Sequence, residues 1–200
     1  MRFSRALAVA FITIAVALMV YAAVKYAGLL QRGIGVEQSG TALVGGPFAL
    51  IDQNGQTVTD ADFRGRIMLV YFGYAYCPDV CPTELAKMAA ALDLLGPDAG
   101  KVAPIFITVD PERDTPAKLK DYVAQFHPQM VGLTGSVEQV TKTARAYRVY
   151  FAKSGDTGGA NYLMDHTSFI YLMDQQGRYR KVFTPDAAPE TIAAGIRQLL

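Results

Sequence analysis

The two cysteines of this 200-residue chain, Cys77 and Cys81, stand close together in the stretch YFGYAYCPDVCPTELAKM, and each is followed by a proline. Two thiols at this spacing can form a local disulfide, act as a redox dithiol, supply half of a metal site, or pack as small apolar side chains. Each of these four chemistries requires a different environment. The strands and helices that position the two cysteines therefore help to distinguish between the four possibilities.

Both cysteines fall where a buried strand is expected to end and a helix to begin. Residues 67–72 (IMLVYF) form a continuous apolar run, and helical spacing of apolar residues starts at Pro82. The first turn of a helix has free N–H groups and a positive dipole end, which stabilise a thiolate, and ligands of α/β sheets bind at this edge. A disulfide that closes so short a loop constrains the unfolded chain little. We therefore expect chemically active thiols here.

The spacing of the pair and the two histidines favour a metal site. A redox dithiol of the thioredoxin kind has two residues between its cysteines, whereas this pair has three. The wider loop can present both sulfurs to one metal ion, but two thiolates alone do not complete a site. His127 follows a predicted helix and precedes a proline, as a turn residue does. His166 directly precedes a predicted buried strand and can face the same sheet edge as the cysteines, which makes it the candidate third ligand.

Other side chains near these positions have simpler interpretations. Asp165 is an obvious polar neighbour of the candidate histidine, although adjacency does not show that it orients the ring. Asp79, between the cysteines, is typical of a solvated turn. Tyr74, Tyr76 and Met164 are interpreted as packing residues.

Strand-like and helix-like segments alternate along the chain. Asn54-Gly55 between two short apolar runs predicts a hairpin, and the charged residues 110–116 (DPERDTP) predict a turn near the sheet edge of the cysteines. This order predicts an α/β fold, a central sheet with helices on both faces. The predicted strands are residues 67–72, 102–109, 167–173 and 179–183, and the predicted helices start at residues 82, 115, 136 and 189.

The N-terminus predicts a membrane anchor. Residues 6–24 (ALAVAFITIAVALMVYAAV) carry no charge and are long enough to cross the roughly 30 Å hydrocarbon core as a helix. A cleaved signal peptide is the alternative, but its apolar region usually has only about 7–15 residues. Arg2 and Arg5 favour a cytoplasmic N-terminus. We predict an anchor at residues 1–24, a flexible linker at 25–46 and one domain at 47–200.

The net charge limits the possible partners of the protein, and the N-terminal segment indicates its location in the cell. The first 24 residues hold two of the 19 basic side chains and none of the 18 acidic ones, which leaves 17 basic against 18 acidic in the remainder. A nearly neutral domain without a basic cluster excludes nucleic acid as a partner. An anchor without an Arg- and Ser-rich transit peptide favours the bacterial cytoplasmic (inner) membrane, crossed once, with the C-terminal domain on the periplasmic side.

Four segments together resemble the Sco/SenC family, which are membrane-anchored copper proteins with a thioredoxin-like fold. They occur in the order of that family and cover most of residues 46–200: YFGYAYCPDVCPTEL, VDPERDTPAKLKDYV, GLTGS and DHTSFIYLMD. The resemblance implies that Cys77, Cys81 and His166 bind one copper ion per chain. It also implies that the protein helps to mature the binuclear copper A centre of cytochrome c oxidase, with the copper-bearing subunit of the oxidase as its partner and an upstream copper donor as a further one.

The chemistry of these ligands agrees with copper, but it leaves the function open between two classes. Thiolates suit Cu(I), imidazole suits Cu(I) and Cu(II), and three ligands leave an open position, whereas structural zinc would want a fourth ligand. A metallochaperone carries copper as cargo and needs His166. A thiol–disulfide oxidoreductase would use only Cys77 and Cys81 to reduce the cysteines of the target. A peroxide-reducing or redox-sensing protein is a third interpretation, but no peroxidase pattern is recognisable.

Overall fold

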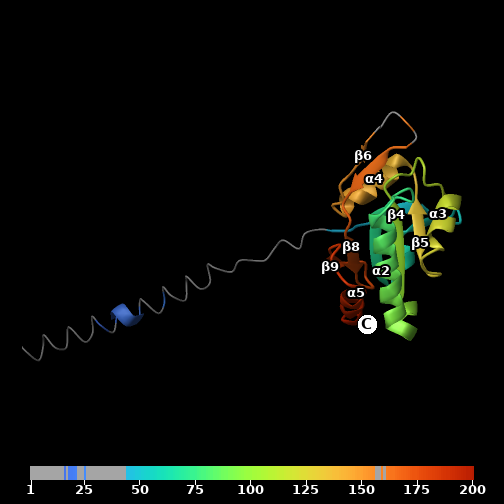
Figure 1. Cartoon of the computed structure of the whole chain (residues 1–200). Helices are drawn as coiled ribbons and strands as arrows, with labels where there is room; N and C mark the ends of the chain where they lie inside the picture. Colours follow the sequence, from blue (N-terminus) through green and yellow to red (C-terminus); the bar gives the residue numbers. More distant parts are fainter. Residues whose placement is uncertain (1–15, 17, 22–24, 26–43, 156–158, 160) are drawn as a thin grey trace, which may run out of the picture. The chain divides into compact units, whose positions relative to one another are not determined.

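The computed structural model describes residues 16, 18–21, 25, 44–155, 159 and 161–200 (Figure 1). The chain divides into two units, Met1–Thr41 and Ala42–Leu200. Most of the predicted anchor and linker lies outside the described residues, and the described residues 16 and 18–21 are helical. Within the described part of the chain, no helix is long and apolar enough to span a membrane. The anchor therefore stays a prediction.

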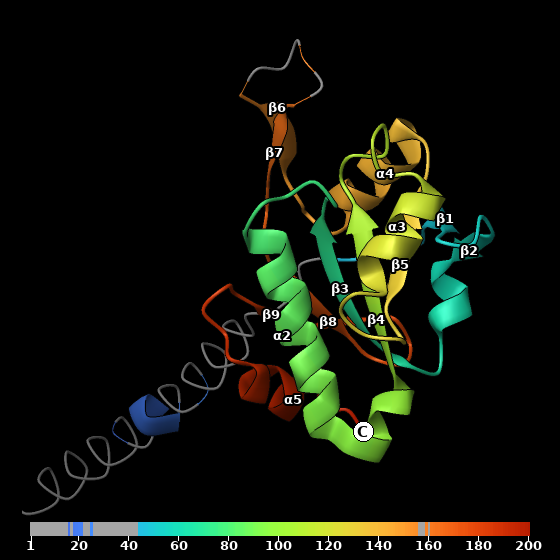
Figure 2. The ribbon, with the colours of Figure 1, turned by 45° about the vertical axis from the view of Figure 1, so that its right-hand side comes forward.

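The larger of the two described sheets is mixed and has the strand order β2-β1-β5-β4-β3-β8-β9 (Figure 2). β3 pairs in parallel with β4, and β4 with β5, while the remaining neighbours are antiparallel. β3 and β4 are buried along their whole length, as their continuous apolar runs predict. The strands are β1 Ala49–Asp52, β2 Thr57–Thr59, β3 Ile67–Gly73, β4 Val102–Thr108, β5 Val131–Thr134, β8 Ile170–Met173 and β9 Tyr179–Phe183.

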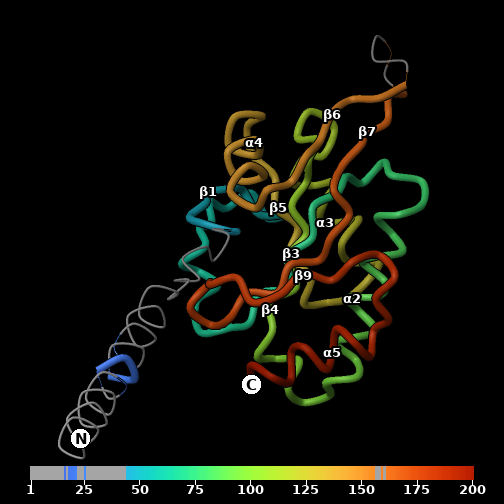
Figure 3. The backbone as a smooth tube through the Cα atoms, turned by 90° about the vertical axis from the view of Figure 1, so that its left-hand side faces the viewer, coloured from blue at the N-terminus to red at the C-terminus, as the bar shows by residue number. Residues whose placement is uncertain are grey.

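Helices cover both faces of this sheet, as predicted. The crossovers β3–α2–β4 and β4–α3–β5 run in the same direction across the sheet, so right-handed connections place α2 and α3 on one face. α5 packs beside α2 on that face, and α4 lies on the opposite face (Figure 3). The α-helices are α2 Val80–Leu95, α3 Pro116–Val123, α4 Val137–Ala146 and α5 Pro189–Arg197, and the 3-10 helices are η1 Asp60–Phe63 and η2 Gly96–Lys101.

Aromatic side chains of β3 reach the two faces alternately. The Tyr71 ring stacks on Phe106 with centroids 6.4 Å apart, on the face covered by α2. The Phe72 ring packs 5.2 Å from Tyr147, the residue that follows α4. The period of two along a strand produces this separation. Residues of β3 can therefore face the α2 side, where the cysteines lie, without contacting the α4 layer.

A second, two-stranded sheet extends from the main body. It consists of β6, Phe151–Ser154, and β7, Leu163–His166, which pair antiparallel with Phe151 opposite His166 (Figures 2 and 3). Part of the glycine-rich loop that joins them lies outside the described residues. This hairpin places His166 at the end of a strand, whereas the sequence placed it directly before one.

Several boundaries differ from the sequence-based prediction. α2 starts at Val80, so Cys81 lies inside the first helical turn. The predicted strand 167–173 begins only at Ile170, since the preceding segment leads out of β7. The third predicted helix ends at Ala146, because Arg148 adopts a left-handed φ of 59°. Its start at residue 136 is confirmed: Ser136 is the N-cap, and its Oγ accepts the N–H of Gln139 at 3.1 Å.

Candidate metal centre

The two cysteines lie at the carboxyl end of β3, where the sequence places them. Cys77 belongs to the loop before α2, and Cys81 is the second residue of the helix. Both thiols are free, with Cys81 buried and Cys77 half-buried. The backbone N–H of Cys81 points at Cys77 Sγ over 3.5 Å. The first turn of α2 thus presents an N–H group to a sulfur, as expected for a site that stabilises a thiolate.

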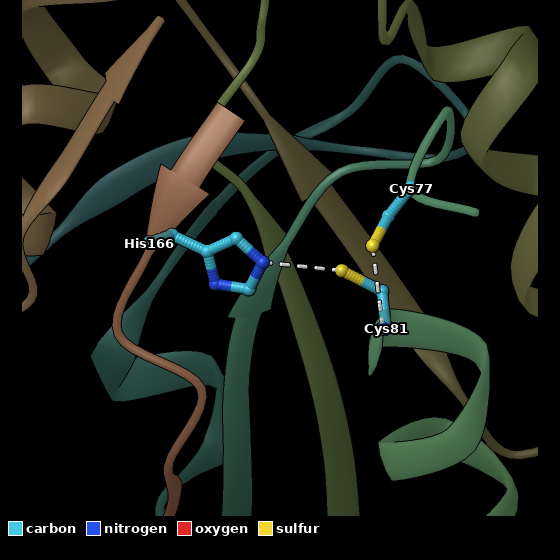
Figure 4. Close-up of side chains that lie close together, drawn as sticks. All are labelled: Cys77, Cys81 and His166. Carbon is cyan, nitrogen blue, oxygen red and sulfur yellow. Dashed lines mark hydrogen bonds between the residues drawn. The ribbon is translucent and has the colours of Figure 1, made fainter. Parts of the chain in front are cut away.

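His166 reaches the cysteines from the end of β7 (Figure 4). Its Nε2 lies 3.3 Å from Cys81 Sγ, and its Nδ1 lies 3.2 Å from the carbonyl oxygen of Thr167. When Nδ1 carries the proton and donates it to Thr167, Nε2 keeps a lone pair that faces the sulfur. One ligand atom from each of the three residues lies within 4.8 Å of the other two. The structure therefore brings together all three residues predicted from the sequence.

Two buried tyrosines fix the orientation of the imidazole. The Tyr71 ring meets the His166 ring edge-on, with centroids 6.1 Å apart and an interplanar angle of 79°. Tyr74 does the same at 5.9 Å and 89°. Such edge-to-face contacts are favourable for aromatic rings and restrict rotation about the bond to the ring. The predicted packing role of Tyr74 is confirmed.

The two thiols have opposite electrostatic environments. The hydrogen bond with the Cys81 side chain lowers the pKa of Cys77, and the backbone N–H groups of Asp79 and Cys81 add to this effect. The same hydrogen bond and burial raise the pKa of Cys81. The environment therefore favours ionisation of the more exposed Cys77 and keeps the proton on the buried Cys81. A metal ion that binds both sulfurs would displace this proton to the solvent.

A buried carboxylate holds the loop that carries Cys77. Asp114 Oδ2 accepts the backbone N–H of Ala75 at 2.9 Å and the hydroxyl of Thr108 at 2.7 Å. Burial raises the pKa of Asp114, against the effect of these hydrogen bonds and of Lys118. Because both bonds reach a single oxygen, this side chain connects the end of β4 to the loop between β3 and α2. The predicted turn at residues 110–116 lies at the expected sheet edge.

A second polar cluster joins the hairpin of His166 to the same turn. Asp110 accepts a hydrogen bond from the Tyr162 hydroxyl at 2.8 Å and forms an ion pair with Arg113. The Arg113 guanidinium lies 3.6 Å from the centroid of the Tyr162 ring and donates to the Tyr162 carbonyl at 2.9 Å. Cation–π and charge-assisted contacts of this kind are strongest when they are sheltered from water. We name Asp110, Arg113 and Tyr162 the hairpin latch.

An open cleft of about 340 Å³ borders two of the three candidate ligands. Cys77 and His166 line it, together with Tyr74 and residues of the hairpin. Asp79 also lines the cleft, but it does not belong to the cluster of ligand atoms. A ligand of another molecule can therefore approach Cys77 and His166 from this side, whereas Cys81 lies behind them in the protein interior.

The remaining candidates from the sequence have other roles. His127 is a turn residue, as predicted: its Nδ1 accepts the N–H of Gln129 at 3.2 Å. Asp165 accepts the Ser154 hydroxyl at 3.0 Å and does not orient the His166 ring, a role that falls to the Thr167 carbonyl. The packing interpretation of Tyr76 is wrong, because this side chain is 48% exposed.

Sequence reasoning missed the residues that support the ligands. Asp110, Arg113 and Asp114 belong to the segment that the sequence marked only as a turn. Tyr162 directly precedes β7, a strand that the sequence did not predict. A usable signal was present: a conspicuous run of acidic and basic residues, DPERD, directly follows a buried strand. Such charges at the carboxyl end of a strand adjoin the ligand-binding edge of the sheet and need partners there.

The fold and the cluster define the class of protein. It is an α/β protein whose strand-to-helix junction carries two thiols and one imidazole around a cleft, a donor set suited to a soft or borderline metal ion. The SCO1/SenC family model matches residues 36–200. The chain therefore belongs to the SCO1/SenC family.

Relatives from bacteria and yeast support this assignment. The chain is 43% identical to Protein SenC of Rhodobacter capsulatus over 166 residues, which are 83% of this chain and 73% of SenC. It is 46% identical to Protein sco1 of Schizosaccharomyces pombe over 160 residues, 78% of this chain and 61% of that protein.

Solved structures confirm the fold. The copper-bound structure of ScoI from Bradyrhizobium japonicum is 47% identical and superposes with a TM-score of 0.73, covering 78% of this chain and 99% of that one. The copper-bound structure of ScoI from Arabidopsis thaliana is 41% identical, with a TM-score of 0.72 over 78% of this chain and 99% of that one. The predicted thioredoxin-like α/β fold is confirmed.

Proposed function

We propose that this protein is a copper metallochaperone that binds one copper ion through Cys77, Cys81 and His166. The observation that carries the proposal is the convergence of the three ligand atoms within 4.8 Å of one another. Thiolates suit Cu(I), and an imidazole suits copper in both oxidation states. A tetrahedral zinc site would need a fourth protein ligand, and among the described residues the cluster contains these three alone.

The open cleft suits copper as a cargo. Three protein ligands leave a position through which an incoming ligand of the target can bind the ion before the chaperone releases it. We assign the copper-bearing subunit of cytochrome c oxidase as the target and its binuclear copper A centre as the destination. Membership of the SCO1/SenC family and the motif segments that contain the three ligands support this target.

The same proposal includes a location and a domain organisation. Residues 1–24 anchor the chain in the bacterial cytoplasmic membrane, residues 25–46 form a tether, and residues 47–200 form the copper-binding domain on the periplasmic side. The uncharged run at residues 6–24, with Arg2 and Arg5 before it, supports this arrangement.

A second candidate function, thiol–disulfide exchange with the cysteines of the target, draws on the contrast between the two thiols. Cys77 is the more exposed and has a lowered pKa, whereas Cys81 is buried and has a raised pKa. An accessible thiolate beside a protected thiol is the arrangement of a dithiol reductant. This activity uses the same sulfurs but does not need the imidazole of His166.

Replacement of His166 separates the two functions. In His166→Ala, the copper-to-protein ratio and the sulfur-to-Cu(II) absorption band should fall, and oxidase activity of cells grown at low copper should be lost. His127→Ala is the matched control, since that histidine lies in a turn and contacts Gln129. Full copper affinity and full oxidase activity of His166→Ala would reject the three-ligand site and leave the reductase function.

A further inference from the structure

Two exposed apolar side chains lie beside the cleft that borders the candidate copper ligands. Leu163 is 42% exposed and lines the cleft, together with Pro78 and Val80. Tyr76 is 48% exposed, and its hydroxyl donates to Asn161 Oδ1 at 3.4 Å, two residues before Leu163. Exposed apolar surface that is rimmed by polar residues marks interaction sites of soluble proteins. These two side chains are therefore candidates for contact with a partner.

The Tyr76 ring is held in place before any partner binds. The Arg113 guanidinium lies 4.9 Å from the centroid of this ring, and Lys118 Nζ lies 5.8 Å from it. Arg113 in turn forms an ion pair with Asp110. An aromatic side chain that is already ordered loses little conformational entropy in a complex, and tyrosine is a frequent anchor of interfaces. Tyr76 is thus suited to contact a partner beside Cys77, the next residue of the chain.

The cleft also carries two exposed carboxylates. Asp79 and Asp165 are exposed and line the cleft, and no lysine or arginine is among the described residues that line it. Asp79 forms no side-chain cap hydrogen bond at the start of α2, and Asp165 accepts one from the Ser154 hydroxyl. Opposite charges across an interface steer association, whereas like charges placed against each other are costly. The cleft therefore favours a partner with lysine or arginine side chains and disfavours an acidic one.

Copper transfer indicates what covers this surface. We name Tyr76, Asp79, Leu163 and Asp165 the cleft rim. A ligand of the partner must enter the cleft to reach an ion that this chain still holds, so the surface around that ligand lies against the rim. We propose that the cleft rim docks the protein that exchanges copper with this chain, through an apolar patch on that protein flanked by lysine or arginine. This inference rests on the proposed copper site, and it assigns recognition of the partner to residues that do not bind the ion.

Leu163→Ser tests the apolar part of the cleft rim, and the double variant Asp79→Asn/Asp165→Asn tests the charged part. The matched controls are Leu94→Ser, because Leu94 is 45% exposed near the end of α2, and Asp121→Asn, because Asp121 is exposed on α3. Neither control residue lines the cleft.

The probe is the copper-free soluble domain of the copper-bearing oxidase subunit. Its dissociation constant from each full-length chain is measured at about 20 and about 200 mM salt, with the chain copper-loaded and copper-free. The Cu(I) affinity in competition with a chelator and the denaturant midpoint are measured on the same preparations.

Leu163→Ser should bind the domain about tenfold more weakly at both salt concentrations, since it loses an apolar anchor. The double variant should bind about tenfold more weakly at the lower salt concentration and lose most of the salt dependence, since it has no rim charge to be screened. The Cu(I) affinity and the midpoint of both should match the wild type, whereas a role in the copper site or in the fold would change them. Both controls should match the wild type in every measurement.

A wild type that does not bind the domain, or whose binding does not weaken as the salt concentration rises, would overturn the inference. A wild-type dissociation constant in Leu163→Ser, or an equal loss in Leu94→Ser, would also overturn it. Self-association of the wild type that Leu163→Ser abolishes would assign the rim to a second copy of this chain instead. If the wild type binds no copper, the proposed function fails, and binding of the domain to the copper-free chains still tests the inference. If the wild type binds copper and both rim variants bind the domain as it does, the inference alone fails.

Discussion

The Tyr162 hydroxyl donates to Asp110 Oδ1 at 2.8 Å and so ties the hairpin that carries His166 to the end of β4. Tyr162→Phe removes this bond and retains the ring that packs on Arg113. We expect the free energy of unfolding to fall by about 1–2 kcal/mol, because Asp110 is buried and loses a donor. The Cu(II) affinity should fall by up to about tenfold, because the imidazole is held less firmly.

Cu(I) affinity should change less in this variant, since two thiolates hold Cu(I) without the imidazole. Chelator competition in both oxidation states measures the difference. Tyr150→Phe is the control, because that side chain is 66% exposed. Equal losses of Cu(I) and Cu(II) affinity in Tyr162→Phe would mean that the hairpin latch does not act through His166.

Gly73 allows the close contact between β3 and the cysteine of α2. A Cβ atom at this position would lie 2.8 Å from Cys81 Sγ and 3.0 Å from Phe106 Cε2, distances at which the neighbours must move. We expect Gly73→Ala to lose about 1–3 kcal/mol of unfolding free energy through overpacking. Displacement of Cys81 should also weaken copper binding. Denaturant unfolding and copper titration of the same preparations measure both effects.

Gly100→Ala provides the comparison for this variant. An added Cβ at Gly100 meets no heavy atom within 4 Å, so its stability and copper affinity should match those of the wild type. A Gly73→Ala protein with unchanged stability and unchanged copper affinity would show that the strand and the helix have room to separate.

The sequence predicted the parts of the fold that have a strong periodic pattern. β3 and β4 are continuous apolar runs, and α2 repeats apolar residues at helical spacing, so their types were readable. β5 was missed because it has four residues and contains Gly132. β6 and β7 were missed because most of their residues are exposed or only partly buried and because they pair only with one another, so no apolar run marks them.

The candidate site likewise has residues that the sequence could predict and residues that it could not. The sequence predicted the three candidate ligands, Cys77, Cys81 and His166, because cysteine and histidine are suited to few kinds of chemistry. A second reason is that ligands of α/β sheets bind at the carboxyl ends of the strands, where a strand leads into a helix. The supporting residues could not be predicted, since the role of Tyr162 or Asp114 depends on contacts between segments that lie far apart in the sequence. An aspartate within a predicted turn gives no sign of the distant backbone N–H group that it accepts.

The turn after β8 contains a carboxylate that makes stability depend on pH. Asp174 accepts the backbone N–H groups of Gln176 and Arg178 at 3.0 and 2.9 Å, and the Arg178 side chain at 2.9 Å. Burial alone would raise the pKa of Asp174, but these hydrogen bonds outweigh it and hold the pKa below the ordinary value of 3.8. A carboxyl group with a lowered pKa in the folded state stabilises the fold above the ordinary value. That stability is lost as the pH falls through the lowered pKa.

Asp174→Asn should therefore destabilise the protein at neutral pH by about 1 kcal/mol, since it keeps an acceptor oxygen but loses the charge. The difference from the wild type should shrink as the pH falls below the ordinary pKa of the carboxyl group, where the unfolded chain binds the proton as well. Urea unfolding at about pH 7, 5 and 3 measures it. Asp98→Asn is the control, because Asp98 pairs with Lys101 at the surface and such pairs contribute little. A difference that stays constant over this range would show that the charge of Asp174 does not stabilise the turn.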